Sequence, residues 1–269
     1  MQPNKLLLVI DVGNTNSEIG VFSGSKLIKS WRFMTKTPRT SDEFSLVITG
    51  FLATEQIDPD DIEDVIVASV VPNIMHSLNN GIKKTFGIKP MQVGPGIKTG
   101  MPILLTDPTE VGADRIIDSV AAFRQNGGPV IVIDFGTATT YDYIDGNGAM
   151  CAKVTCPGIQ ISADALFRNA AQLPNIAIVK PGTILSRDTV SGMQAGLVYG
   201  YLGQVDFIIR KMKEEIGRDD IKVIATGGYG RMFFEESEQI DYYDAKLPLK
   251  GLLYIYEKNR KQPEKKYEK

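Results

Sequence analysis

Two short stretches of the chain place an aspartate and a glycine directly after a run of apolar residues. The first is "VIDVGNTNSEIGVF", residues 9–22, and the second is "VIDFGTATTYDYID", residues 132–145. A strand that ends in Asp and turns through Gly puts a carboxylate beside unpaired backbone N–H groups at the tip of a hairpin. Such a tip can bind phosphate oxygens through its N–H groups and hold a hydrated Mg²⁺ through its carboxylate. Both stretches are therefore candidate parts of a nucleotide site.

The first stretch has further oxygen and nitrogen donors close to its aspartate. Asp11 is the candidate Mg²⁺ ligand, and the hydroxyls of Thr15 and Ser17 can face phosphate oxygens. A plain hairpin that uses Asp and Gly only for turn geometry is the alternative. One copy alone would favour that alternative, whereas two copies, each after an apolar strand, favour the nucleotide site.

The elements around each stretch follow the same order. Each predicted strand is followed by a tight turn, a second strand, another turn and a third strand. A helix is predicted from Ser41, a candidate cap, because Phe44, Ile48 and Phe51 recur at helical spacing. Each half later offers another buried strand, "VIVAS" in the first and "KVIATGG" in the second. This repetition predicts two similar α/β domains around a shared cleft, built by duplication.

The domain boundary should fall near residue 120, within or just after the helix predicted for "GADRIIDSVAAFRQ". We expect an N-terminal domain at 1–120 and a C-terminal domain at 121–269. The end of the chain, 257–269, is strongly charged and contains a proline, so we expect it to be a frayed tail.

Composition excludes several classes of protein. The net charge of −2 offers no basic surplus for a polyanion, so we expect no nucleic-acid partner. Cys151 and Cys156 stand without a histidine cluster, which argues against a cysteine metal site or redox pair. The sequence has no run of about 18 apolar residues, so we expect no membrane span and a cytoplasmic location.

Other motifs are weaker. "DFG" at Asp134 matches the magnesium motif of protein kinases, but the partner motifs HRD and VAIK are missing. "GPGIKTG" has the spacing GxGxxxG, and Pro102 follows where a dinucleotide-binding helix should begin. A hydrolase triad would need His76, the single histidine, which we interpret as an ordinary surface or core residue.

A long helix predicted near 189–216 carries Gly192, Gly196 and Gly200 in one row. Each glycine costs about 1 kcal/mol of helix propensity, so the row needs a reason. Close backbone packing is that reason, either within the domain, which we favour, or against a second subunit.

Five segments together resemble the type III pantothenate kinases, a bacterial family in the superfamily of sugar kinases, heat-shock chaperones and actin. They are "DVGNTN", "DPTEVGADR", "DFGTATT", "PGIQISADAL" and "DTVSGMQAGLVYGYLGQVD", in the family's order and at its spacing. The resemblance implies two duplicated ribonuclease-H-like domains, the actin-like ATPase fold, around a central cleft. It also implies ATP-dependent phosphorylation of pantothenate to 4′-phosphopantothenate, the first step of coenzyme A synthesis. A homodimer, Mg²⁺ and a monovalent cation, K⁺ or NH₄⁺, are expected with it.

The resemblance also assigns roles to individual positions. The ATP-binding turn corresponds to Asp11, Val12, Gly13, Asn14, Thr15, Asn16 and Ser17, and Thr137 to a further ATP contact. The pantothenate-binding positions correspond to Gly112, Ala113, Asp114, Arg115 and Thr189, with Asp114 as the proton acceptor. Asp134 corresponds to the ligand of the monovalent cation, and Asp11 to a Mg²⁺ contact through water. Two positions depart from the family: Glu18 replaces an apolar residue, and Leu105 replaces a frequent tyrosine.

Physical chemistry supports these roles but leaves alternatives open. Asp114 begins a predicted helix, where the dipole favours negative charge, and it could serve as base or merely as helix cap. Arg115 could bind the carboxylate of pantothenate bidentately or form a surface ion pair. A cation at Asp134 would add positive charge near the transferred phosphoryl group, or the second turn could bind phosphates by itself.

Other classes of function remain to be weighed. A non-catalytic regulator of the same fold would not need the base Asp114. An actin-like or chaperone-like ATPase would carry long insertions, for which 269 residues leave no room. A kinase of another small hydroxy acid is the nearest enzymatic alternative.

Overall fold

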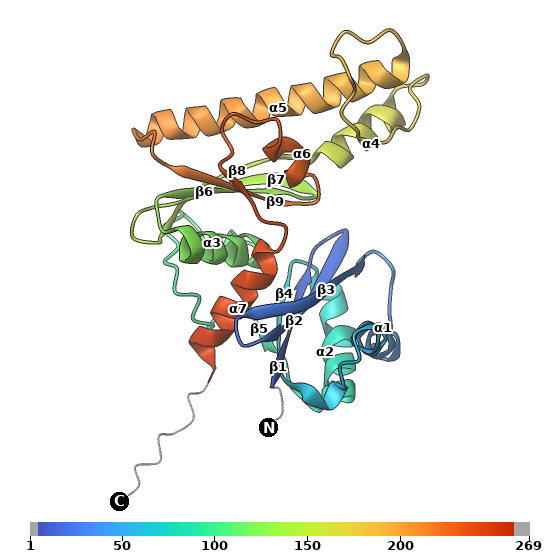
Figure 1. Cartoon of the computed structure of the whole chain (residues 1–269), viewed down its shortest axis with the longest axis vertical. Coiled ribbons are helices and arrows are strands. Elements are labelled where there is room, and N and C mark those ends of the chain that lie inside the picture. The colour runs from blue at the N-terminus through green and yellow to red at the C-terminus, as the bar shows by residue number, and fades with distance from the viewer. Residues whose placement is uncertain (1–4, 261–269) are drawn as a thin grey trace, which may run out of the picture. The chain divides into compact units, whose positions relative to one another are not determined.

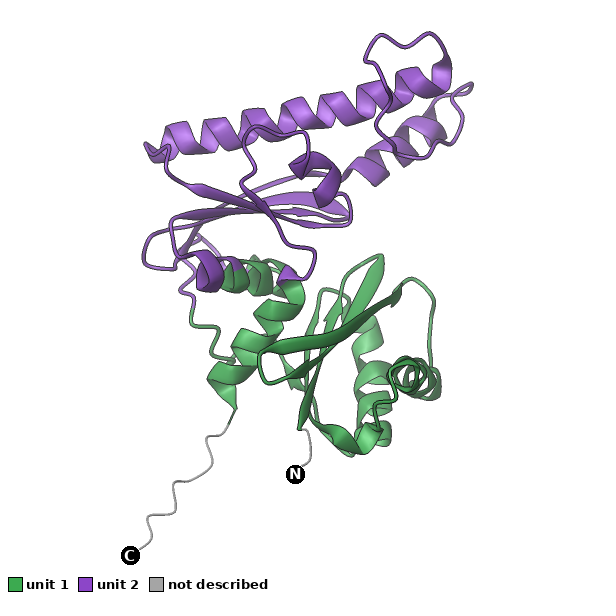
Figure 2. Ribbon diagram, viewed as in Figure 1, with its two compact units in different colours: residues 1–100, 110–121, 248–269 green, residues 101–109, 122–247 purple. Residues whose placement is uncertain are grey.

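The computed structural model describes residues 5–260 and divides into two compact units (Figure 2). The first unit holds residues 5–100, 110–121 and 248–260, and the second holds 101–109 and 122–247. Each unit has one five-stranded sheet with helices packed beside it (Figure 1).

The first sheet and its helices come mainly from the first hundred residues. Its strands are β1 (Leu6–Val12), β2 (Asn16–Ser23), β3 (Lys26–Met34), β4 (Ile62–Ser69) and β5 (Met91–Gln92). The helices are α1 (Ser41–Thr54), α2 (Pro72–Phe86), the start of α3 (Ala113–Asn126) and nearly all of α7 (Leu247–Asn259), with short 3₁₀ turns at Pro59–Asp61 and Pro108–Glu110.

The second sheet begins after α3. Its strands are β6 (Val130–Phe135), β7 (Ala138–Ile144), β8 (Met150–Pro157), β9 (Lys222–Gly227) and β10 (Tyr242–Tyr243). Its other helices are α4 (Ile159–Asn169), α5 (Thr189–Ile216) and α6 (Gly230–Phe234).

The two sheets have the same topology. The first has the strand order β3-β2-β1-β4-β5, and the second has β8-β7-β6-β9-β10. In each, three antiparallel strands form a meander, and the next two strands run parallel to the first of them. The predicted duplicated α/β architecture is therefore confirmed.

Side-chain alternation decides which face of each sheet carries the aspartate. In β1, Leu8 and Ile10 belong to the core formed with α1 and α2, so Asp11 lies on the opposite face. In β6, Ile133 and Phe135 belong to the core under α5, so Asp134 also lies on the opposite face. The two aspartates thus occupy equivalent places in the two sheets.

The C-terminal helix α7 explains why the compact units differ from the predicted contiguous domains 1–120 and 121–269. Residue 251 is a glycine, and a Cβ there would lie 2.0 Å from the carbonyl oxygen of Ile117, so α7 crosses α3 in close contact. A Cβ at Gly20 of β2 would lie 2.9 Å from Leu249. Residues from 248 on therefore complete the first unit. The predicted frayed tail is also helical up to Asn259, and 261–269 lie outside the described residues.

The start of α1 differs slightly from the prediction. The N-cap is Thr40, not Ser41: its hydroxyl accepts from the N–H of Glu43, and the Glu43 carboxylate accepts from the N–H of Thr40. This reciprocal capping box satisfies two N–H groups at the helix start.

The glycine row on α5 does not pack inside its unit. Apart from the adjacent residues and the nearby backbone of α5 itself, no described atom lies within 4 Å of a Cβ placed at Gly196, Gly200 or Gly203, and only the Cβ of Ser186, at 4.0 Å, comes near Gly192. The favoured explanation, close packing within the domain, is therefore wrong.

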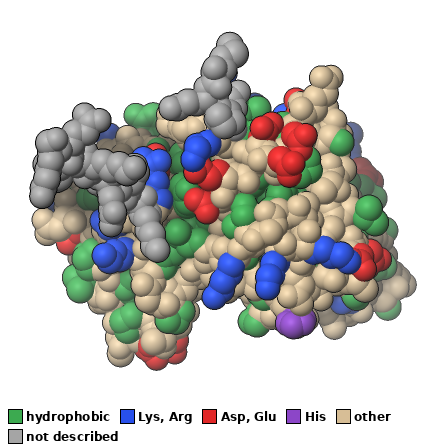
Figure 3. Space-filling view, turned by 90° about the horizontal axis from the view of Figure 1, so that it is seen from below, with side chains coloured by type: hydrophobic (Ala, Val, Ile, Leu, Met, Phe, Trp, Pro, Cys, Tyr) green, Lys and Arg blue, Asp and Glu red, His purple; other side chains and the backbone are tan. Residues whose placement is uncertain are grey.

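Two further features bear on the sequence-based expectations. The single histidine, His76, is exposed on α2, where its ring lies 3.0 Å from the side-chain amide of Asn80 (purple in Figure 3). Within residues 5–260, no helix is both long and apolar enough to cross a membrane.

Candidate active site

The turn between β1 and β2 closes tightly. The N–H of Gly13 donates to the carbonyl oxygen of Asn16 at 3.2 Å, and a Cβ at Gly13 would lie 2.9 Å from that oxygen. Asn14, Thr15 and Asn16 are exposed at its tip. The tip is therefore accessible to a ligand, and its role in binding ATP remains a prediction.

Two residues assigned to this turn point into the protein. Val12 is buried, and so is Ser17, whose hydroxyl lies 2.8 Å from the hydroxyl of Thr35. The expectation that the Ser17 hydroxyl faces a phosphate oxygen is therefore wrong. The assignment of Val12 and Ser17 to ATP binding remains a prediction, and only the backbone groups of these two residues could contact the ligand.

Asp11 has a second carboxylate beside it. In the register of the sheet, Asp11 lies opposite Glu18 of β2 and beside Ala68 of β4, so these side chains share one face. Glu18 is only 7% exposed, and its carboxylate lies 3.5 Å from the guanidinium of Arg32. Carboxylate oxygens gathered in this way suit a hard divalent cation.

The segment Gly112–Arg115 forms the start of α3. A Cβ at Gly112 would lie 2.4 Å from Oδ1 of Asp114, so only glycine leaves room for this carboxylate. The same oxygen accepts from the backbone N–H of Arg115 at 2.8 Å. Within the described chain this is the one hydrogen bond of the Asp114 carboxylate, which leaves Oδ2 available to accept a proton.

Val70 connects this segment to the turn between β1 and β2. Its N–H donates to the carbonyl oxygen of Val12 at 3.1 Å, and its side chain would lie 3.4 Å from a Cβ at Gly112. The structure therefore places the Asp11 turn and the Asp114 segment together, at the carboxyl ends of β1 and β4. This is the position where open α/β sheets bind ligands.

Two glycines lie close to Asp134, one in the second turn and one at the end of β9. A Cβ at Gly136 would lie 3.0 Å from its Oδ2, and one at Gly227 would lie 2.4 Å from its Oδ1. Gly227 also has φ +87°, a backbone conformation that other residues rarely adopt. Two close approaches thus fix where this carboxylate lies.

Hydroxyl groups flank Asp134 on the same face. In the register of the sheet its neighbours are Thr140 on β7 and Thr226 on β9. Thr226 is fully buried, and its hydroxyl has no hydrogen-bond partner within the described residues. An unpaired buried hydroxyl beside a carboxylate is unusual and suits a cation ligand. Sequence reasoning missed Thr226, although it directly precedes two glycines at the end of an apolar strand.

The two remaining assigned residues are exposed in the second unit. Thr137 lies at the tip of the second turn, and its carbonyl oxygen accepts from the N–H of Gly158 at 3.0 Å. Thr189 is the first residue of α5. The preceding Asp188 caps that helix, and hydrogen bonds from Ser191 hold the pKa of the Asp188 carboxyl below its usual range.

No group of three or more His, Cys, Asp or Glu side chains within residues 5–260 could hold a metal ion by itself. A bound Mg²⁺ would therefore take most of its ligands from phosphate and water, as is usual for this ion.

Comparison with known proteins identifies the family. The family model of type III pantothenate kinase matches residues 7–211. A type III pantothenate kinase from Agathobacter rectalis is 54% identical over 257 residues, which cover 95% of this chain and 99% of that protein. The chain belongs to the type III pantothenate kinase family. It is therefore an ATP-dependent kinase, and the predicted enzyme class is confirmed.

Solved structures share the fold at low sequence identity. A Campylobacter jejuni protein described as a Baf family transcriptional activator is 20% identical, with a TM-score of 0.57, and covers 94% of this chain and 98% of its own. Component A of the (R)-2-hydroxyglutaryl-CoA dehydratase from Acidaminococcus fermentans is 14% identical, with a TM-score of 0.54 and coverage of 94% and 97%. These likenesses support the two-domain, actin-like ATPase fold and carry no statement about activity.

Proposed function

We propose that Asp114 is the proton acceptor in the reaction of this kinase, which phosphorylates pantothenate with ATP. The hydroxyl oxygen of pantothenate forms a bond to the γ-phosphorus of ATP, the bond from that phosphorus to ADP breaks, and the hydroxyl proton passes to Oδ2 of Asp114. A positioned carboxylate can accept a proton released late in phosphoryl transfer. The observation that carries this role is the Asp114 carboxylate, oriented through Oδ1 by Arg115 and placed beside the ATP turn by Val70.

The other residues of the first unit would bind the two substrates. The backbone of the turn from Asp11 to Ser17, with the exposed side chains of Asn14 and Thr15, would hold the phosphates of ATP. Asp11, next to Glu18, would contact Mg²⁺ through water. Arg115, with Gly112 and Ala113, would bind the carboxylate of pantothenate, for which a guanidinium has matching geometry.

The second unit would supply the remaining contacts. Asp134 would bind a monovalent cation, K⁺ or NH₄⁺, and the hydroxyl of Thr226 fits this ion because its oxygen is buried without another partner. Such an ion would offset negative charge on the transferred phosphoryl group. Thr137 would contact ATP and Thr189 pantothenate, and both are exposed as these roles require.

A homodimer through α5 would explain its glycine row. Gly196, Gly200 and Gly203 have open space around them, and Phe207, on the same helix face, is 58% exposed. Small residues permit close approach of a second backbone, and the exposed aromatic ring adds apolar area. Gly196→Arg should therefore sediment as a monomer where the wild type sediments as a dimer. Glu215→Arg, exposed near the end of the same helix, is the control; an unchanged dimer in Gly196→Arg would contradict this interface.

The base assignment is tested by Asp114→Asn. The assay follows ADP production from ATP and Mg²⁺, with and without pantothenate and with and without K⁺. In the wild type, ADP should form only when pantothenate is present. In the variant kcat should fall by about 10²-fold to 10⁴-fold, because the amide cannot accept the proton. Circular dichroism and thermal unfolding serve as controls for an intact fold. A folded variant with a near-normal rate would remove Asp114 from the base role.

A further inference from the structure

A groove of about 250 Å³ opens beside the ATP turn in the first unit. Asn14 forms one wall, the connection from β3 to α1 forms another with Lys36 and Arg39, and the beginning of α2 forms the third with Asn73 and Ser77. Within the described chain, the lining carries two positive side chains and no acidic one. The charge of the groove is therefore matched to an anion.

The guanidinium of Arg39 is fixed in place. Its Nη1 donates to the carbonyl oxygens of Met34 at 2.6 Å and Thr37 at 3.3 Å, and the group lies over the ring of Phe33, 5.1 Å from its centroid. These contacts use one nitrogen of a group that has five N–H donors. Arg39 can thus present its remaining donors to a ligand without losing much side-chain freedom.

Lys36 differs from other lysines of the first unit. Lys84 pairs with Asp42, and Lys29 pairs with Glu55 at 2.8 Å. Lys36 is exposed and forms no hydrogen bond or ion pair within residues 5–260. Its charge is not compensated by the protein and is available to an anion.

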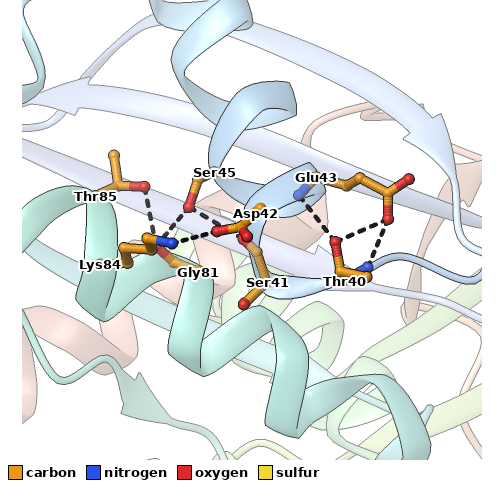
Figure 4. Close-up of polar contacts among 8 residues, drawn as sticks. All are labelled: Thr40, Ser41, Asp42, Glu43, Ser45, Gly81, Lys84 and Thr85. Atoms are coloured by element: carbon orange, nitrogen blue, oxygen red, sulfur yellow. Dashed lines mark hydrogen bonds and ion pairs between the residues drawn. The ribbon is translucent and has the colours of Figure 1, made fainter.

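The connection that carries both cations is held at its two ends. At the start, the N–H of Thr35 donates to the carbonyl oxygen of Thr15 at 2.9 Å, which ties it to the ATP turn. At the end, Thr40 and Glu43 form the capping box of α1 (Figure 4).

The helices behind the groove are also joined. A Cβ at Gly81 of α2 would lie 2.8 Å from the carbonyl oxygen of Ser41, so α1 and α2 are in close contact. Ser45 adds a hydrogen bond of 3.1 Å to the carbonyl oxygen of Gly81 (Figure 4). The walls are therefore preformed, which lowers the entropic cost of binding.

We propose that this groove is a phosphate subsite in which Lys36 and Arg39 bind a phosphate group of a substrate or product. The proposal rests on the assignment of ATP to the turn from Asp11 to Ser17, because Asn14 belongs to both. The volume suits a phosphate group with water better than a whole nucleotide. The phosphate comes either from ATP or from the product, 4′-phosphopantothenate.

The test is the affinity of the full-length Lys36→Met variant, measured by titration calorimetry with MgATP, adenosine, 4′-phosphopantothenate and pantothenate. One lost charge-assisted contact should weaken a phosphate ligand about tenfold. Adenosine and pantothenate should bind as before. Weaker MgATP binding identifies the nucleotide as the source, and weaker 4′-phosphopantothenate binding identifies the product.

Control variants separate this effect from general charge loss. Lys26→Met removes an exposed lysine at the start of β3, the strand that precedes the connection carrying Lys36, and should leave every affinity unchanged. Lys36→Arg should restore most of the affinity. Unchanged binding of both phosphate ligands by Lys36→Met, or weaker binding of pantothenate alone, would overturn the subsite.

One further variant separates failure of the subsite from failure of the ATP assignment. If Asp11→Asn weakens MgATP binding and Lys36→Met weakens neither phosphate ligand, only the subsite is wrong. If Asp11→Asn also leaves MgATP binding unchanged, the ATP turn itself is misassigned, and the subsite falls with it.

Discussion

The two aspartate turns share a backbone plan and differ in the side chains around the carboxylate. Asp11 has the carboxylate of Glu18 opposite it, whereas Asp134 has Thr140 opposite and the buried hydroxyl of Thr226 beside it. Two neighbouring carboxylates favour a divalent ion, and one carboxylate with neutral oxygens favours an ion of lower charge. If the proposed ion sites are correct, a few neighbours on the adjacent strands distinguish the ions that the two turns would bind.

The turns also differ in how tightly the backbone encloses the aspartate. Gly227 has a positive φ, and a Cβ there would meet both the Asp134 carboxylate and the backbone of Phe135, whereas a Cβ at Gly13 would meet only the carbonyl oxygen of Asn16. The second carboxylate is thus held in place by close packing, while the first lies beside an exposed tip.

Gly227→Ala should lower stability more than any other variant considered, and more than Gly13→Ala in the first turn. The added methyl group at residue 227 combines backbone strain with three contacts shorter than 3 Å, so we expect a loss of about 4 kcal/mol in the free energy of unfolding. At residue 13 we expect about 2 kcal/mol. Urea denaturation measures the free energy of unfolding of both variants. Equal losses would show that the backbone around the two aspartates is equally constrained.

Replacing the buried residues Thr35 and Thr226 should change the free energy of unfolding by smaller and different amounts. Thr35→Val leaves the buried Ser17 hydroxyl without its partner and should cost about 2 kcal/mol. Thr226→Val removes a hydroxyl that has no hydrogen-bond partner in residues 5–260, so stability without K⁺ should stay the same or rise by up to about 1 kcal/mol.

Added K⁺ sharpens this comparison. The wild type and Thr35→Val should gain thermal stability from the ion, because a ligand that binds only the folded state stabilises it. Thr226→Val should gain much less. An equal gain in all three proteins would exclude Thr226 as an ion ligand.

The smallest effect concerns the support of the first turn. Thr40→Ala removes the cap of α1 and should cost about 1 kcal/mol at neutral pH. Hydrogen bonds from the backbone N–H and the hydroxyl of Thr40 hold the pKa of Glu43 below its usual value, so the stability that these two bonds add exists above the unfolded pKa and is lost as the pH falls through the folded one. Thr40→Ala lacks only the bond from the hydroxyl, so only this part of its effect depends on pH.

The difference in stability between wild type and Thr40→Ala should therefore shrink on acidification below about pH 4. Unfolding free energies measured between pH 3 and pH 7 check it. Ser41→Ala is the control, because Ser41 is not the N-cap, and it should show no such pH-dependent loss.

Local features of the fold could be predicted from the sequence because they rest on neighbouring residues. The apolar strand, Asp and Gly recur in both halves, which predicted the equivalent places of Asp11 and Asp134. The helix α1 was also predicted, but its cap was placed one residue late, at Ser41, although Thr40 lies three residues before Glu43, as in a capping box.

Features that depend on distant packing could not be predicted. β2 is buried on both faces, so alternation gave no sign that the Ser17 hydroxyl points inward. That the Thr226 hydroxyl has no partner in the described part of the chain depends on three strands from separate parts of the sequence. The spacing of apolar residues in α7 does not show that this helix packs against residues more than a hundred positions earlier in the sequence.

The return of α7 to the first unit has a consequence for synthesis. Domains usually fold as units while the chain leaves the ribosome. Here, the surface formed by Gly20 and Ile117 stays uncovered until the residues of α7 emerge, although the second unit is by then complete. The half of the enzyme that is translated first is therefore the last to close. In a chain that stopped before residue 247, the apolar surface of the first unit that α7 covers would stay exposed, and chaperones and proteases could bind it.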